Sequence, residues 1–104
     1  MKVYNKLVRD KIPELIEADG KTCKTRTLSD SEYMVALEAK LNEEVAEYQA
    51  DKSLEEMADV LEVLQAICVA RGYSLEELDE VRARKIEERG AFAERIFLES
   101  VEKK

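Results

Sequence analysis

The sequence predicts an all-α protein, an antiparallel bundle of about four helices. Three observations predict this class. The 104 residues include one proline and three glycines, so few positions break a helix. Apolar residues recur every three to four positions over long stretches, as on one face of a helix. Three serines stand three residues before a glutamate at expected helix starts, as in capping boxes. A chain of this length is expected to form one domain, residues 1–104.

The first helix is expected within YNKLVRDKIPELIEADG. Its apolar stripe consists of Leu7, Val8, Ile12, Leu15 and Ile16. Pro13 leaves two alternatives: the helix begins near residues 10–11 with the proline in its first turn, or a short helix precedes the proline. Gly20 is placed to end the element. The β-branched segment KTCKTRTLS follows and predicts a loop or a short extended strand.

The next two helices are expected at residues 30–50 and 54–71, on either side of a short turn. Ser29 and Ser53 are their N-cap candidates, and Gly72 closes the second of the pair. The two apolar stripes are Tyr33, Met34, Leu37, Leu41, Val45 and Tyr48, and then Met57, Val60, Leu61, Leu64, Ile67 and Cys68. Helices joined by so short a turn are expected to pack antiparallel.

The last helix is expected from its Ser74 cap to about Arg89, with Gly90 as its stop. The tail AFAERIFLESVEKK has two interpretations. Either it continues as helix, or its alternating apolar residues form a short extended segment that pairs near residues 22–28.

Composition excludes several classes of function. The formal net charge is −7, and an acidic domain is a poor non-specific binder of nucleic acid. The chain has no histidine, so Ser–His and Cys–His nucleophiles are excluded and catalysis needs carboxylates, Lys, Arg, Tyr or a metal. Two distant cysteines form neither a disulfide framework nor a zinc site. No stretch has the apolar length of a membrane span or a signal peptide, so we expect no membrane partner and a cytoplasmic location.

Carboxylates at a three-residue spacing occur on two consecutive expected helices. Glu44 and Glu47 share one face of the second helix, with Cβ atoms about 5–6 Å apart, and Glu56 and Asp59 repeat the spacing on the third. Antiparallel packing would bring all four together, which is costly unless a cation meets them. Oxygen ligands of this kind favour Mg²⁺, with Mn²⁺ as the alternative ion. The competing interpretation is a solvated acidic surface.

The motifs EEVAE at 43–47 and EMAD at 56–59 resemble the EExxE…ExxD signature of the all-α nucleoside triphosphate pyrophosphatases, the MazG-like superfamily. The segments YNKLVRDKIPELI, LEAKLNEEVAEY and KIEERGAFAERIFLE extend the resemblance over nearly the whole chain. Together they look like a small, single-domain, house-cleaning branch of that superfamily. The gap of eight residues between Glu47 and Glu56 is short for the superfamily.

The resemblance implies hydrolysis of a nucleotide between its α and β phosphates, giving a monophosphate and pyrophosphate. It implies that Glu44, Glu47, Glu56 and Asp59 are the metal ligands. It places Glu43 beside Glu44 in the catalytic motif, where Glu43 holds a second metal, orients water or lies at the surface. Magnesium would neutralise and position the triphosphate and lower the pKa of a bound water, and a spare carboxylate would take the proton.

Basic side chains gather near both ends of this acidic chain. The candidate phosphate-binding residues are Lys6, Arg9 and Lys11, and Lys85, Arg89 and Arg95. If both ends approach the metal site, they form a phosphate clamp, in which arginine is the better bidentate partner. The alternative is solvation, or local ion pairs such as that of Arg9 with Asp10 or Glu14. Lys40, one turn before Glu44, is a further candidate for the clamp, but it is expected foremost as the salt-bridge partner of Glu44.

Two other functions fit the same residues. One is phosphoribosyl-ATP pyrophosphohydrolase, which belongs to the same superfamily and cleaves the same type of bond. The other is a non-catalytic helical dimerisation module, against which the intact set of four carboxylates argues. The apolar stripes of the second and third helices are wider than one neighbour covers, so we expect a homo-oligomer, a dimer. The alternative is a compact monomer whose terminal segments wrap both helices.

Overall fold

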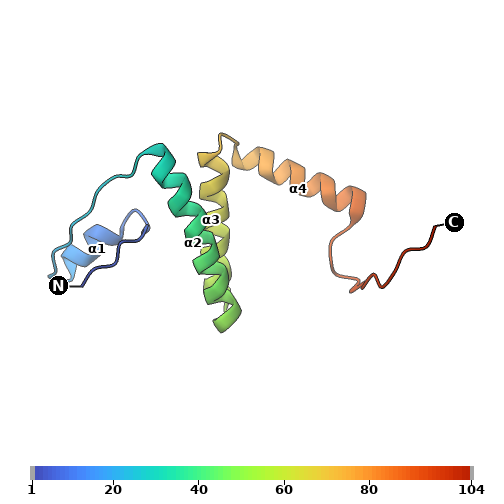
Figure 1. Cartoon of the computed structure of the whole chain (residues 1–104), viewed down its shortest axis with the longest axis horizontal. Helices are drawn as coiled ribbons and strands as arrows, with labels where there is room; N and C mark the ends of the chain where they lie inside the picture. Colours follow the sequence, from blue (N-terminus) through green and yellow to red (C-terminus); the bar gives the residue numbers. More distant parts are fainter. Residues whose placement is uncertain (1, 104) are drawn as a thin grey trace.

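The computed structural model describes residues 2–103 and confirms the all-α class (Figure 1). Its helices are α1 (Ile12–Ala18), α2 (Asp30–Asp51), α3 (Leu54–Ala70) and α4 (Leu75–Arg89). The predicted bounds of α2 and α3 differ from the observed ones by a single residue at the C-terminal end. Within residues 2–103, no helix has the length and hydropathy that a membrane crossing requires.

Side-chain caps set where the three longer helices begin. Ser29 accepts a hydrogen bond from the Glu32 amide, and the Glu32 carboxylate accepts one from the Ser29 amide, which completes a capping box. Ser74 and Glu77 form the same box at α4. At α3 the box is half formed, because Ser53 accepts from the Glu56 amide but the Glu56 carboxylate does not return to the Ser53 amide. That carboxylate is therefore available elsewhere.

Of the two alternatives for the first helix, the structure selects the first. Helix α1 begins at Ile12 with Pro13 in its first turn, where the missing amide of proline costs no hydrogen bond. The chain leaves the helix through Gly20, whose φ of +83° is a conformation that other residues rarely adopt. The seven-residue helix has no buried residue.

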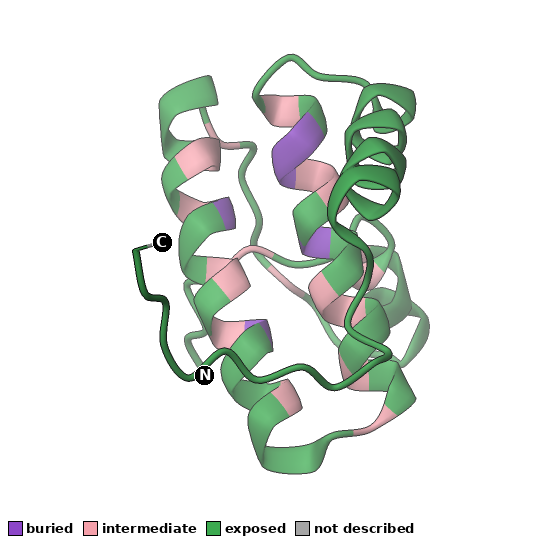
Figure 2. Ribbon diagram, turned by 90° about the vertical axis from the view of Figure 1, so that its right-hand side faces the viewer, coloured by how far each residue is buried: buried purple, intermediate pink, exposed green. Residues whose placement is uncertain are grey.

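Helices α2 and α3 form an antiparallel hairpin that holds the core. Lys52 adopts a left-handed conformation at the end of α2, and its amide donates to the Tyr48 carbonyl, so the chain reverses within two residues. The buried apolar residues of the core are Leu37 from α2 and Val63 and Ile67 from α3. Figure 2 shows the buried positions on these two helices. Leu7, from the segment before α1, packs against this core.

The extended pairing between residues 22–28 and the C-terminal tail does not form, and the tail does not continue as helix. In the described part of the chain both segments lack regular secondary structure, and they lie at opposite ends of the molecule (Figure 1). An isolated two-stranded ribbon is marginal in water unless it packs on another element. Here the first segment contacts α1, where Cys23 Sγ lies 3.9 Å from the Pro13 carbonyl oxygen, but the tail lies too far away to pair with it.

The arrangement is open. Among the helices of residues 2–103, α4 packs only against α3 and then projects away from the hairpin (Figure 1). The molecule extends 66 Å along its longest axis, and its radius of gyration is 18.7 Å, against about 13 Å for a compact chain of this length.

Candidate metal centre

The reversal of the chain between α2 and α3 brings acidic side chains of both helices close together. Glu44 lies two turns before the end of α2, and Glu56 and Asp59 lie in the first two turns of α3. Because the connection is short, these positions face each other across the hairpin. One oxygen from each of the three carboxylates lies within 4.8 Å of the others. We call Glu44, Glu56 and Asp59 the acid trio.

The acid trio contains buried oxygens that nothing in the protein satisfies. Glu44 is only 6% exposed, the one charged residue buried in the described part of the chain. Its Oε2 atom has no hydrogen-bond partner, and neither has the buried Oε2 of Glu56. A buried carboxylate oxygen without a partner costs free energy. Oxygen ligands opposite each other on Mg²⁺ stand about 4.2 Å apart, close to the spread of the trio, so these residues fit a hard divalent cation.

Repulsion between neighbouring carboxylates also marks this spot. The negative charge of Glu44 is the main cause that raises the pKa of Glu47, followed by desolvation and the charge of Glu56. Desolvation, and then the charges of Asp59 and Glu44, raise the pKa of Glu56. Glu47 therefore lies beside the trio, although no oxygen of it falls within the trio's close grouping.

Lys40 is the first of two cations that contact these acids. Its ammonium lies 3.1 Å from Glu44 Oε1 and 3.4 Å from Glu43 Oε1. Burial lowers the pKa of Lys40, but the bonds and charges of Glu44 and Glu43 outweigh it and raise that pKa overall. The predicted salt bridge between Lys40 and Glu44 is thus confirmed. Glu43 is turned to Lys40 and stands outside the trio.

Arg9 is the second cation. Its Nη2 donates to Asp59 Oδ1 across fifty residues of chain. The local pairing of Arg9 with Asp10 or Glu14 is not formed among the ion pairs of residues 2–103. Leu7 explains this placement, since its packing on the core carries the segment before α1 over the hairpin.

A cavity of about 550 Å³ opens beside the acid trio. Its walls combine Glu44 and Asp59 with the basic residues Lys6, Arg9, Lys11 and Lys40. The structure therefore brings the three N-terminal candidates for phosphate binding to the side of the acids. A concave surface with cations next to carboxylates suits a polyanion that carries a metal ion.

The three C-terminal candidates lie elsewhere. Lys85 and Arg89 are exposed on α4, and Arg95 is exposed in the tail that follows. Helix α4 leads away from the hairpin (Figure 1), so within one chain these side chains do not reach the acid trio. Their proximity to the site, expected if both chain ends approached it, is not found in the single chain.

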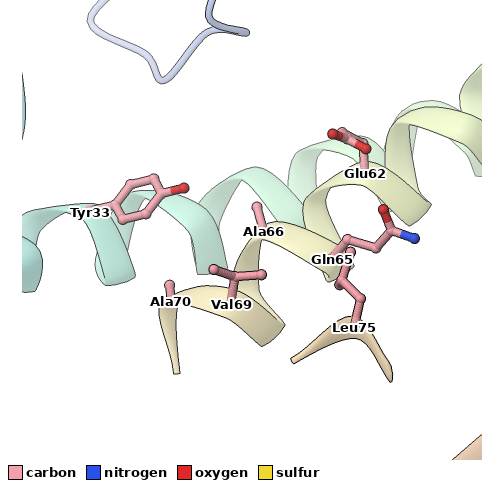
Figure 3. Close-up of a pocket in the computed structure, with 7 residues that line it drawn as sticks. All are labelled: Tyr33, Glu62, Gln65, Ala66, Val69, Ala70 and Leu75. Atoms are coloured by element: carbon pink, nitrogen blue, oxygen red, sulfur yellow. The ribbon is translucent and has the colours of Figure 1, made fainter. Parts of the chain in front are cut away.

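A second cavity, of about 310 Å³, adjoins the first (Figure 3). The two share Tyr33, Glu62 and Ala66, and the second adds Gln65, Val69, Ala70 and Leu75. Sequence reasoning left Glu62 out of the site. Its spacing, three residues after Asp59 on the same helix, was the available signal.

Comparisons with known proteins do not assign the chain to a family. No protein-family model matches the chain, and no solved structure matches it. A protein of Mycolicibacterium smegmatis described as uncharacterized is 68% identical over 44 residues, which are 42% of this chain and 45% of the relative. The match thus spans less than half of the relative's length.

Proposed function

We propose that this protein is a metal-dependent nucleotide pyrophosphohydrolase that cleaves between the α and β phosphates. One observation carries the proposal: the buried Glu44 has an unpartnered oxygen, and this residue converges with Glu56 and Asp59 from two helices. The choice of bond rests on the resemblance of EEVAE and EMAD to the pyrophosphatase signature. Phosphoribosyl-ATP pyrophosphohydrolase remains the alternative within that superfamily.

A purely structural role does not account for the acid trio. Well-packed apolar residues commonly stabilise a core as well as or better than buried charges do. The four acids Glu44, Glu47, Glu56 and Asp59 are contacted by two cations, Lys40 and Arg9. Two negative charges remain, and one divalent cation offsets them. We therefore propose Mg²⁺, or Mn²⁺ in its place, as the resident ion.

The chain's own residues divide the work of binding. Glu44, Glu56 and Asp59, with Glu47 beside them, would hold the ion, which supplies charge neutralisation and acidifies a water. Lys6, Arg9 and Lys11 face the cavity and would bind phosphate oxygens. The assignment of Glu43 to the orientation of water stays a prediction. The smaller cavity, with Tyr33 at one end, offers room for the nucleoside.

We further propose that the working form is a homodimer. The chain exposes 9819 Å², whereas a compact monomer of 11.9 kDa exposes about 5,900 Å². The excess, about 3,900 Å², is more than the about 1,000–2,500 Å² that each chain of an obligate homodimer buries. Large apolar residues are exposed on α3 and α4, including Leu61, Leu64, Leu78, Val81 and Ile86. A second copy of the chain would cover part of this excess exposed surface.

The test is a panel of nucleoside triphosphates with Mg²⁺ or Mn²⁺, scored for pyrophosphate and monophosphate. Reaction in ¹⁸O-water then locates the attacked phosphorus, with the label expected in the monophosphate for some substrate of the panel. Label in released orthophosphate contradicts cleavage at the α phosphate. A thermal melt with and without Mg²⁺ separates the enzyme from a dimerisation module, which would show no metal-dependent rise in Tm beyond general salt effects.

A further inference from the structure

We propose that Arg9 and Lys40 are exchangeable counter-ions of the metal site. Each neutralises one metal-binding carboxylate while the site holds no metal, and each turns to the phosphates when a metal–nucleotide complex binds. This inference rests on the proposed function, because it assigns a regulation of binding to the same site.

The two cations occupy the very carboxylates that would hold the metal. Arg9 Nη2 donates to Asp59 Oδ1, and Lys40 Nζ lies 3.1 Å from Glu44 Oε1. Within residues 2–103, Glu56 has no such ion pair, and its Oε2 is unpartnered. If Glu44 and Asp59 hold a divalent cation, its charge would offset the negative charge that attracts both side chains. It also repels them at short range, where the interaction of charges is strongest.

The displaced cations can contact phosphate oxygens in the cavity beside the acid trio. Both line the 550 Å³ cavity, together with Lys6 and Lys11. A polyphosphate in that cavity presents oxygens that accept charge-assisted hydrogen bonds, and the guanidinium fork of arginine matches two of them at once. Two of the four carboxylate charges are thus neutralised before the metal binds, and the same two cations would neutralise phosphate charge afterwards.

The two residues differ in how far they can move. Arg9 belongs to the irregular segment before α1, and its side chain is 58% exposed. Lys40 sits on α2 one turn before Glu44, and its side chain is 18% exposed. Arg9 can therefore leave Asp59 by a swing of its segment, whereas Lys40 exchanges partners by rotamer changes alone.

This exchange predicts opposite effects of one substitution on two ligands. When either Arg9 or Lys40 is replaced, a metal ion on its own meets one internal competitor fewer and should bind more tightly. Phosphates should bind more weakly, because they lose a cation. A residue that only binds phosphate changes the second affinity alone, and a residue that only balances charge changes the first alone.

The experiment is isothermal titration calorimetry on the full chain with two probes, Mg²⁺ alone and inorganic pyrophosphate in saturating Mg²⁺. We expect Arg9→Gln and Lys40→Met to tighten Mg²⁺ binding by about three- to tenfold and to weaken pyrophosphate binding by about tenfold. Arg9→Lys keeps the charge and should keep the Mg²⁺ affinity of the wild type. Arg71→Gln is the matched control, because it breaks a comparable ion pair, with Glu38 at 3.0 Å, away from the cavity.

Unchanged or weaker Mg²⁺ binding in both variants overturns the exchange, and so does unchanged pyrophosphate binding. Arg9→Gln changes an exposed side chain outside any helix, so it tests the proposal even if Lys40→Met fails to fold. The proposed function fails separately: if the variants show both binding effects but the wild-type protein releases no pyrophosphate from any nucleotide, the activity is refuted and the exchange stands. Wild-type protein that hydrolyses a nucleotide while its variants shift both affinities in the same direction does the reverse.

Discussion

The two ends of the chain carry similar groups of basic side chains in different surroundings. Near the N-terminus, Leu7 packs on the hairpin core and Arg9 pairs with Asp59, so the basic residues around them line the cavity beside the acids. Near the C-terminus, Lys85 and Arg89 lie on α4, which leads away from the hairpin (Figure 1). The first group is fixed by contacts within one chain.

Compared with the N-terminal group, the C-terminal half lacks contacts that would cover its apolar side chains. Its apolar residues are exposed although its helix is well capped at Ser74. Phe92 and Phe97 are 97% and 86% exposed. Apolar side chains exposed to that degree bring no stability to a single chain, and a second copy that covers them gains the free energy of their burial. The nearby basic residues Lys85, Arg89 and Arg95 would then meet the acid trio of the partner or face solvent.

The largest expected effect concerns the carboxylates that lie beside the N-terminal basic group. Asp59 lies on α3 and pairs with Arg9 of the N-terminal group. We predict that Asp59→Asn lowers the rate of pyrophosphate release by about 100-fold or more, since it removes a metal ligand. The same substitution should remove the rise in Tm that Mg²⁺ gives the wild type. Glu87→Gln, an acid on α4, is the control and should keep both. Wild-type turnover by Asp59→Asn would show that the site is assigned to the wrong residues.

The next effect concerns stability. Leu37 is 3% exposed at the centre of the hairpin core, so we predict that Leu37→Ala lowers the free energy of unfolding by about 2–4 kcal/mol. Val35, on the same helix, is 71% exposed, and Val35→Ala should cost less than about 0.5 kcal/mol. Urea titrations followed by circular dichroism measure both. Equal costs would mean that another chain covers Val35 in solution.

The C-terminal half is tested by a charge placed in its apolar surface. Val81 on α4 is 41% exposed in one chain, and if a partner covers it, Val81→Asp should raise the dimer dissociation constant by about 30-fold or more. Val3→Asp makes the same change at the N-terminal end, at a residue that is 68% exposed. Light scattering across micromolar concentrations reads out the mass. A wild-type mass of one chain throughout the range refutes the dimer.

The features that sequence could predict are those set within a few residues. Ser29 and Ser74 cap helices because their partners stand three residues away, and the carboxylates of α2 and α3 meet because a two-residue turn joins the helices. The pairing of Arg9 with Asp59, fifty residues apart, was not predictable, because it depends on how Leu7 docks on the hairpin core. Of the two alternatives for residues 22–28, the loop formed and the short strand did not, because pairing needs a neighbouring strand and no local pattern states whether one is present.

The smallest expected effect separates the acid trio from the other carboxylates of the chain. The pKa values of Glu56 and Glu47 are raised, so the folded state takes up protons there before the unfolded state does. In chelator, the Tm of the protein should therefore rise as the pH is lowered from 7 toward about 5, still above the ordinary carboxyl pKa of about 4.3. Glu32 behaves in the opposite sense, because Arg26 lowers its pKa to about 2 and its contribution to stability is lost only at more acidic pH.

Saturating Mg²⁺ should reverse this trend. Protons then compete with the ion for the same carboxylates, so acidification removes metal-linked stabilisation and the Tm should fall between pH 7 and about 5. Differential scanning calorimetry at matched ionic strength gives both slopes, and Glu56→Gln should flatten the rise seen in chelator. Parallel slopes with and without Mg²⁺ would mean that the repulsion at the hairpin turn is relieved by something other than a metal ion.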